Sequence, residues 1–435
     1  MYQCSRAPRR VTSWIALLAA FSVGSAVAQS PDTTIESIVS SDKFAEAVAY
    51  LRADHERFIE DIIYINEIPA PSFGEGPRAK AYRDLLQSHG LEDVRIGAEG
   101  NAMGVRRGSG NGSVVAVLAH LDSFFPKGTA AKVRREGNKL FAPGVGDPAR
   151  GLAVILTIIR ALDHADIDTE SDILFVGNVG EEGLGNLRGS KHLLLKGSYR
   201  DKIKQFVTIC GPAGAPGQWP ITNAGIGQLR YRVAFKGQGG HSFRHFGRAN
   251  PANAMAEAIS RVAAIPVPGS PKTTHNVGIV SGGSSATSIP VEVTMDVDMR
   301  SESGEELARL NRAFLAALDE AVAAENARAS QTESSVEVNT ELVVDRPAGS
   351  TATSSRIYQV AAASAEAFGL EPVARTAPSD ANVPMSLGIP AIAIGPGHVY
   401  SGRSLEAWTD VDPELTLEAN GIVLATVLGL AGVSN

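Results

Sequence analysis

Short apolar runs alternate with amphipathic stretches through much of the chain. Runs rich in Val, Ile, Leu and Ala that end in glycine or polar residues cover residues 113–121, 172–179, 204–210 and 389–394. Such runs are typical of strands that are buried on both faces of a sheet. Between the first two runs, residues 151–162 repeat apolar side chains at helical spacing. This alternation predicts an α/β fold with a mixed or parallel sheet and helices on both of its faces.

The pattern changes over residues 225–346, where half-exposed strands alternate with long amphipathic helices. The expected strands are 228–236, 276–280, 291–300 and 336–344, and the expected helices are 251–264 and 305–326. Their β-α-β-β-α-β order is that of a ferredoxin-like unit. The α/β pattern then resumes with a helix near 357–368. We therefore expect one domain, formed by residues 29–224 and 347–435, that is interrupted by a second domain at 225–346.

The N-terminus has the features of a secretory signal peptide. Three arginines within residues 6–10 precede an apolar stretch at 14–23, and the small residues Ala-Val-Ala follow at 26–28. The apolar stretch is shorter than the roughly 20 residues that a membrane anchor needs, so an anchor is the less favoured alternative. We expect residues 1–28 to be removed during export to the periplasm or the medium, by the general or the twin-arginine route. No membrane association is expected after cleavage.

Composition excludes several classes of protein. The 435 residues suffice for two or three domains, and the 44% hydrophobic and 20% charged content is that of an ordinary globular protein. A net charge of −7 argues against a nucleic-acid-binding protein with a broad basic face. Of the two cysteines, Cys4 lies in the signal peptide and Cys210 remains. The exported chain therefore cannot form an intramolecular disulfide.

Polar residues gather where the predicted strands end, which is where sites form in α/β sheets. The residues in question are His120, Asp122, Asp147, Glu181, Glu182 and Cys210. Asp122 lies two positions after His120 and can orient its imidazole from behind. One imidazole with several carboxylates suits zinc, manganese or cobalt. Each motif alone also occurs in ordinary surface turns, but their order and shared position predict a metal site.

Six short motifs together resemble the M20 metallopeptidases, the family of carboxypeptidase G2, aminoacylase and succinyl-diaminopimelate desuccinylase. They are AHLD at 119–122, GDPARG at 146–151, GEEG at 180–183, GGHS at 239–242, DMR at 298–300 and SDAN at 379–382. The resemblance covers nearly all of the chain after the signal peptide. It implies a catalytic domain of zinc-peptidase type, with the inserted ferredoxin-like domain acting as a lid and as the contact of a homodimer.

The resemblance also implies roles for individual residues. His120 resembles the ligand of one metal, Asp147 the carboxylate that bridges two metals, and Glu182 a ligand of the second. Glu181 resembles the general base that takes a proton from the metal-bound water, and Asp122 belongs with it to the catalytic set. The implied cofactor is zinc, as one or two ions, with manganese or cobalt as alternatives.

Two further residues of the inserted domain correspond to substrate-binding positions. His241 resembles the residue that reaches a neighbouring active site and stabilises the oxyanion. Arg300 resembles the anchor for a substrate carboxylate, a task that suits its two-pronged guanidinium. The implied substrate is a small peptide or N-acyl amino acid, cleaved beside a free carboxylate as a carboxypeptidase does. The family holds the peptide bond after the bridging aspartate in cis, which Pro148 makes easier here.

The sequence departs from the family at two ligand positions. Cys210 replaces an aspartate, and it can be either a zinc-binding thiolate or a buried structural cysteine. Arg403 stands where the last histidine ligand belongs, and a guanidinium has no lone pair for a metal. His398 could supply the missing nitrogen. Alternatively, one metal remains with His120, Asp147 and Cys210 while Arg403 pairs with Glu182 in place of the second metal.

A third alternative is that no catalytic metal binds. The chain would then be a binding protein, or a lyase or isomerase that uses Glu181, His241 and Arg403 in metal-free acid–base chemistry. The remaining ligand set favours the metal instead. We therefore expect an exported amidohydrolase or exopeptidase of M20 type that acts on neither nucleic acid nor membrane.

Overall fold

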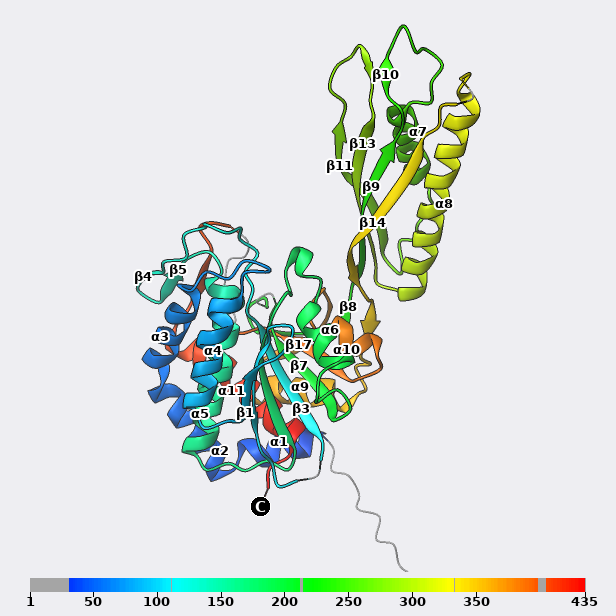
Figure 1. Ribbon diagram of the computed structural model, residues 1–435. Helices are drawn as coiled ribbons and strands as arrows, with labels where there is room; N and C mark the ends of the chain where they lie inside the picture. The colour runs from blue at the N-terminus through cyan, green and yellow to red at the C-terminus, as the bar shows by residue number, and fades with distance from the viewer. Residues whose placement is uncertain (1–30, 111, 212–213, 332, 398–403, 435) are drawn as a thin grey trace, which may run out of the picture.

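The computed structural model describes residues 31–110, 112–211, 214–331, 333–397 and 404–434 (Figure 1). The chain leaves its largest sheet at Gly225 and returns to it at Gly349. We call residues 31–225 and 349–434 the large domain, and residues 227–346 the small domain. The small domain projects from one side of the large domain.

The large domain is built from both ends of the chain. Its first part contains α1 (Pro31–Val39), α2 (Asp42–Ala53), α3 (His55–Asn66), α4 (Gly76–Ser88), β1 (Glu92–Ile96), β2 (Ala102–Arg106), β3 (Val114–His120), β4 (Arg134–Glu136), β5 (Lys139–Phe141), η1 (Val145–Ala149), α5 (Arg150–His164), β6 (Asp172–Asn178), η2 (Gly183–Gly185), α6 (Arg188–Leu195), β7 (Ile203–Ile209) and β8 (Gln218–Gly225). Its second part contains β15 (Gly349–Ser350), α9 (Arg356–Ala367), β16 (Glu371–Thr376), α10 (Asn382–Ser386), β17 (Ala391–Ile394), β18 (Trp408–Asp410) and α11 (Pro413–Ala431).

The large sheet has nine strands in the order β1-β2-β6-β3-β7-β17-β8-β15, with β16 paired to β8. Strands β6, β3, β7 and β17 run parallel, whereas β2 on one side and β8 on the other are antiparallel to their neighbours. The sheet is therefore mixed, which confirms the predicted α/β class. Because β6, β3 and β7 are adjacent and parallel, their carboxyl ends meet at one edge.

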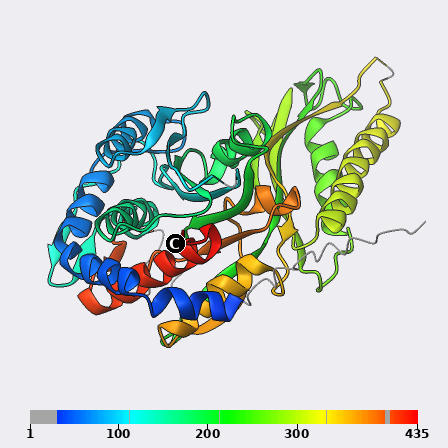
Figure 2. The same cartoon turned by 90° about the horizontal axis from the view of Figure 1, so that it is seen from below.

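Strand β3 shows why the sheet lies between two helical layers. All seven of its residues are buried. Val115, Val117 and Ala119 join the core under α5 and α11, while the alternate residues face the opposite core with α6 and α10. In the view from below, α1 (blue) lies against α11 (red) and α9 (Figure 2). A strand that is buried on both faces needs apolar residues on both, and β3 is apolar up to its last residue, His120.

Helix α11 is the one helix of the described residues that is long and apolar enough to span a membrane. Its 19 residues are 78% buried inside the protein over the apolar window. Asp412 caps its first turn by accepting bonds from the N–H groups of Glu414 and Leu415. A helix that packs on all sides inside a protein core has the same apolar composition as a membrane-spanning helix.

The small domain is a four-stranded antiparallel sheet with two helices. Its elements are β9 (Gly227–Lys236), β10 (Gly240–His241), α7 (Pro251–Ala263), β11 (Thr273–Gly282), β12 (Ser288–Ile289), β13 (Glu292–Ser301), α8 (Gly304–Arg328) and β14 (Glu337–Arg346). The sheet order is β11-β13-β9-β14, and α7 and α8 share a core with its inner face. The short pair β10–β12 lies at the end farthest from the large domain (Figure 1).

Candidate active site

His120, Asp147 and Cys210 converge at the carboxyl edge of the large sheet. His120 is the last residue of β3, and Cys210 directly follows the adjacent strand β7. One ligand atom of each of the three residues lies within 4.8 Å of those of the other two. The topology thus brings together residues that are up to 90 positions apart in the chain. The set of nitrogen, oxygen and sulfur donors suits a zinc ion.

Asp147 links the other two members of this cluster. Its Oδ1 lies 2.7 Å from Nε2 of His120 and 3.8 Å from the Sγ of Cys210. It lies in the η1 turn directly before α5, where its own backbone is extended (φ −154°, ψ 107°). The peptide bond from Asp147 to Pro148 is cis, as the family resemblance implies.

Asp122 lies behind His120 and contacts its ring through the main-chain oxygen. The Nδ1 of His120 lies 2.8 Å from the main-chain oxygen of Asp122, and 3.6 Å from its Oδ1. The carboxylate instead accepts hydrogen bonds from the N–H groups of Glu181 (2.9 Å) and Glu182 (2.8 Å). Asp122 therefore fixes both the histidine and the loop that carries the two glutamates.

Electrostatics at this edge reflect deep burial and close charges. Burial alone would lower the pKa of His120, but the carboxylates of Asp147 and Asp122 raise it well above its usual value. Burial alone would raise the pKa of Asp122, but His120 and the two N–H donors hold it below its usual value. Burial and the charge of Asp147 raise the pKa of the Cys210 thiol. A metal must therefore displace protons from His120 and Cys210 when it binds.

Glu181 is a buried carboxylic acid that can exchange a proton near neutral pH. Burial, with a further contribution from the charge of Glu182, raises its pKa to about 8. The cations of Arg346 and His120 oppose this shift. The Nη1 of Arg346 lies 3.4 Å from Oε1 of Glu181, and its Nη2 donates to the main-chain oxygen of Glu181. These are properties of a general acid–base group.

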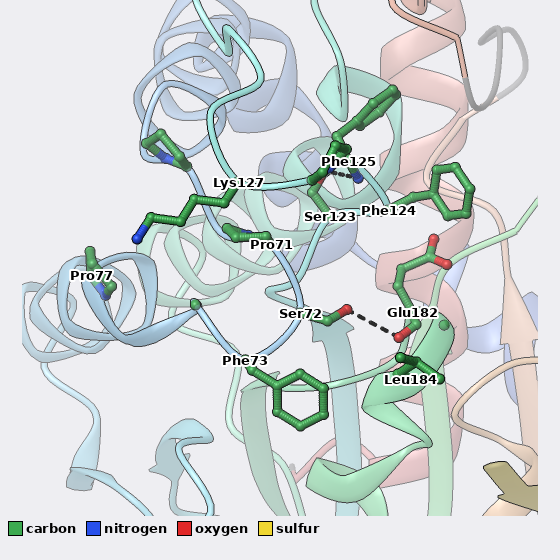
Figure 3. Close-up of a pocket in the computed structure, with 14 residues that line it drawn as sticks. Pro71, Ser72, Phe73, Pro77, Ser123, Phe124, Phe125, Lys127, Glu182 and Leu184 are labelled. Atoms are coloured by element: carbon green, nitrogen blue, oxygen red, sulfur yellow. Dashed lines mark hydrogen bonds between the residues drawn. The ribbon is translucent and has the colours of Figure 1, made fainter. Parts of the chain in front are cut away.

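Glu182 does not belong to the compact three-residue cluster of the described residues. Its carboxylate points into an open groove between Phe124 and Leu184 (Figure 3). The hydroxyl of Ser72 donates to Oδ2 of Asp122 at 3.0 Å and to the main-chain oxygen of Glu182 at 3.1 Å. The groove wall is therefore tied directly to the cluster.

The two predicted substrate-binding residues of the small domain lie outside this cluster. His241 is exposed on β10, where its Nδ1 accepts a bond from the N–H of Phe243 at 3.2 Å. Arg300 lies on β13 and pairs with Asp298 at 2.7 Å. Among the described residues, neither has a hydrogen bond or ion pair with the strand-end cluster. His398 and Arg403 lie outside the described residues.

Three contributors were missed by the sequence analysis. Arg346 contacts Glu181, and Ser72 bridges Asp122 to the main chain of Glu182, as described above. Asp380, in the SDAN motif, is buried and accepts bonds from Asn178 (2.8 Å) and Ser190 (2.6 Å). Asn178 ends β6, so Asp380 braces the strand that leads into Glu181. The motif itself was a signal for Asp380, whereas Arg346 and Ser72 have no local sequence signal.

Comparisons with known proteins agree with this arrangement. A model of peptidase family M20/M25/M40 matches residues 116–419. Carboxypeptidase G2 of Pseudomonas sp. (strain RS-16) is 24% identical over 294 residues, which are 65% of this chain and 66% of the relative. Succinyl-diaminopimelate desuccinylase of Corynebacterium glutamicum is 28% identical over 200 residues, 46% of this chain and 52% of the relative. The matched regions thus span about half to two thirds of these relatives.

Solved structures share the fold over most of the chain. Aminopeptidase PepT of Bacillus cereus superposes with a TM-score of 0.70 at 20% identity, covering 87% of this chain and 99% of that protein. The YxeP protein of Bacillus subtilis, described as a dinuclear metal-binding peptidase of the M20 family, gives 0.60 at 16% identity, with coverage of 87% and 99%. At this identity the likeness establishes the fold.

Proposed function

Because the chain belongs to peptidase family M20/M25/M40, we propose that it is an exported, metal-dependent amidohydrolase or exopeptidase. It cleaves a peptide or N-acyl amide bond beside a free carboxylate. The observation that carries the proposal is the convergence of His120, Asp147 and Cys210 next to the buried acid Glu181. Export is supported by the signal-peptide pattern of residues 1–28.

The donor set at the sheet edge fits a zinc ion. His120, Asp147 and Cys210 offer one nitrogen, one oxygen and one sulfur atom within a short span, and zinc accepts all three ligand types. Three protein ligands leave a fourth position open, as in catalytic zinc sites. When bound, zinc would polarise the substrate carbonyl and lower the pKa of water at the site to about 7.

Glu181 moves the proton in this reaction. Its carboxylate takes a proton from the attacking water and returns it to the nitrogen of the leaving amine. Burial favours proton exchange near neutral pH, because it brings the pKa of Glu181 to about 8. Asp122 fixes the position of the base through its bonds to the N–H groups of residues 181 and 182.

The small domain supplies two of the substrate contacts. Arg300 is half-exposed and carries a guanidinium that can bind the free carboxylate in a two-pronged manner. His241 lies on β10, at the end of the small domain that is farthest from the large domain of its own chain, which fits a role in the active site of a second copy (Figure 1). We therefore include a homodimer, joined through the small domains, in the proposal.

Metal analysis of the purified mature protein, combined with a hydrolysis assay, tests this function. The assay panel contains dipeptides and N-acyl amino acids, and Glu181→Ala serves as the matched variant because it removes the base but none of the three clustered ligands. We expect at least one zinc per protomer, hydrolysis that a chelator abolishes, and loss of hydrolysis with retained zinc in Glu181→Ala.

The metal count also separates the alternatives for the second metal position. About one ion per protomer supports a mononuclear site in which Arg403 takes the place of the second cation. About two ions indicate that His398 or another group restores the missing ligand. No bound metal after zinc is supplied, or full activity in Glu181→Ala, would contradict the proposal and leave a binding protein or metal-free chemistry.

A further inference from the structure

We propose that the groove beside Glu182 binds a bulky apolar, preferably aromatic, acyl group, and that Phe73 is the residue that selects it. This inference rests on the proposed function and names the substrate class more narrowly. The groove has a volume of about 800 Å³. Figure 3 shows the Phe73 ring on one side of Glu182 and the Phe124 ring on the other.

Phe73 has a backbone conformation that large side chains avoid. Its φ is +68°, in the left-handed region, and its side chain is 66% exposed. An exposed ring contributes little burial to offset this conformational cost. Strained residues of this kind cluster at functional sites, where the surrounding structure holds them in place. At Phe73 the strained backbone places an aromatic ring at the groove wall.

The ring is also held by a network of charges. The guanidinium of Arg188 lies 4.8 Å from the centre of the Phe73 ring. Arg188 is itself fixed by ion pairs with Glu75 at 2.8 Å and Glu99 at 3.2 Å. A cation over a ring restricts its orientation, so Phe73 presents a preformed surface. A preformed aromatic surface binds an apolar group with less loss of conformational entropy.

The residue before Phe73 connects this surface to the reacting centre. Ser72 bonds both Asp122 and the main chain of Glu182, so the loop that carries Phe73 is attached to the site. Glu182 lines the groove and directly follows the proposed base Glu181, so the groove lies beside the loop at which the scissile bond is expected. The groove is also lined by Phe124 and Leu184, which are 52% and 51% exposed.

The groove is suited to the acyl side of the amide. The proposed anchor for the free carboxylate, Arg300, lies in the small domain, whereas every lining residue of the groove belongs to the large domain. The two halves of the substrate therefore lie in different domains. Apart from Glu182 at one end and Lys127 at the other, the lining residues are uncharged, and most are prolines, phenylalanines and other apolar residues. Such a lining favours an apolar group over a charged one.

The test compares N-acyl derivatives of one amino acid that carry acetyl, hexanoyl, phenylacetyl or succinyl groups. We expect kcat/KM for the phenylacetyl compound to exceed that for the acetyl compound by at least about tenfold. Phe73→Gly, which keeps the backbone conformation accessible, should reduce this preference to about twofold or less, because it lowers kcat/KM for the phenylacetyl compound more than that for the acetyl compound. Phe124→Ala should also reduce it. Tyr64→Ala, an aromatic residue of α3 that is 51% exposed outside the groove, is the control and should change neither rate.

A second measurement separates this inference from the proposed function. Calorimetric binding of the phenylacetyl and acetyl compounds to Glu181→Ala needs no turnover. If the phenylacetyl compound binds more strongly and Phe73→Gly abolishes this difference, the groove assignment is supported, whether or not the wild-type protein hydrolyses the compounds. If the wild-type protein hydrolyses none of them, the proposed hydrolase function is refuted. Equal rates and equal binding for all acyl groups, or a preference for succinyl, would overturn the groove assignment and leave the hydrolase intact.

Discussion

Arg346 of the small domain lies against Glu181 of the large domain, and both side chains are buried. The Nη1 of Arg346 is 3.4 Å from Oε1 of Glu181, and Nη2 donates to the main-chain oxygen of the same residue. Arg346 is the last residue of β14, where the chain leaves the small domain. The position of the small domain is thus coupled directly to the proposed base. A closure movement of the small domain would act on Glu181 through this pair.

The first prediction concerns this pair. Arg346→Ala should lower kcat by about 10- to 100-fold, because Glu181 loses the cation and the donor that orient it. KM and zinc content should change little, since Arg346 touches none of the three clustered ligands. Arg346→Lys keeps the charge but not the two-pronged geometry, and it should recover part of the lost rate. An unchanged kcat in a folded Arg346→Ala protein would show that the pair has no part in catalysis.

The second prediction concerns the thiol at the metal site. Cys210→Ala should reduce the zinc retained after dialysis, because it removes one of three clustered donors. Cys210→Asp should retain metal but shift the preference from zinc toward manganese or cobalt, since carboxylate oxygen is a harder ligand than sulfur. Elemental analysis after exposure to equal amounts of the three metals checks both variants. Full zinc content in Cys210→Ala would identify Cys210 as a structural residue.

The third prediction concerns backbone strain at Phe73. Phe73→Ala and Phe73→Gly both remove the ring, but only glycine adopts a φ of +68° without steric cost. Phe73→Gly should therefore be more stable than Phe73→Ala by about 1 kcal/mol. Urea denaturation of the two variants measures this difference. Equal stabilities would show that the loop relaxes when the ring is removed.

The strands that carry the site could be predicted because each has a predominantly apolar run that ends in polar residues or glycine. Residues 113–121, 172–179 and 204–210 lie within one residue of β3, β6 and β7 at both ends. The helices before β1 were not predicted, although α2 buries Phe44, Ala47 and Leu51 at helical spacing.

Long-range contacts could not be predicted from local patterns. Arg346 is 165 positions from Glu181, and only the return of β14 to the large domain brings them together. The expectation that Asp122 lies behind His120 and orients its ring named no contacting atom, and the closest contact is made by the main-chain oxygen of Asp122. The carboxylate is occupied by the N–H groups of residues 181 and 182, so the carbonyl takes that role. Strand periodicity predicts which face a side chain is on and says nothing about which atom it uses.

The fourth prediction concerns acid sensitivity. Burial, together with the charges of Arg160 and Arg57, lowers the pKa of His89 from 6.5 to about 4. Between these two values the unfolded chain binds the proton more readily, so stability is greatest above pH 6.5 and falls as the pH drops toward 4. The slope has an upper limit of about 1.4 kcal/mol per pH unit, reduced because the ring is only half-buried. Urea midpoints at pH 7 and pH 5 should differ less in His89→Gln than in the wild-type protein, and identical differences would contradict the assignment.

The fifth prediction tests whether His241 acts in the site of a partner. His241→Ala and Glu181→Ala should each be inactive alone, because every site in either homodimer lacks one of the two groups. In a mixed dimer, one of the two sites combines Glu181 of the first copy with His241 of the second and is complete. Refolding or co-expressing the variants in equal amounts should therefore restore about a quarter of wild-type activity, since half of the dimers are mixed and each has one complete site.

The matched control mixes Glu181→Ala with Arg346→Ala, because both of these residues belong to the site of their own chain. Neither site of its mixed dimers is complete, because Arg346 contacts Glu181 of its own chain, so this mixture should show no activity beyond that of Arg346→Ala alone. The converse test mixes the double variant Glu181→Ala/His241→Ala with wild type. The mixed dimer then has no complete site if His241 serves its partner, whereas it has one if His241 acts within its own chain. The activities of these two mixtures therefore decide whether His241 serves its own site or that of its partner.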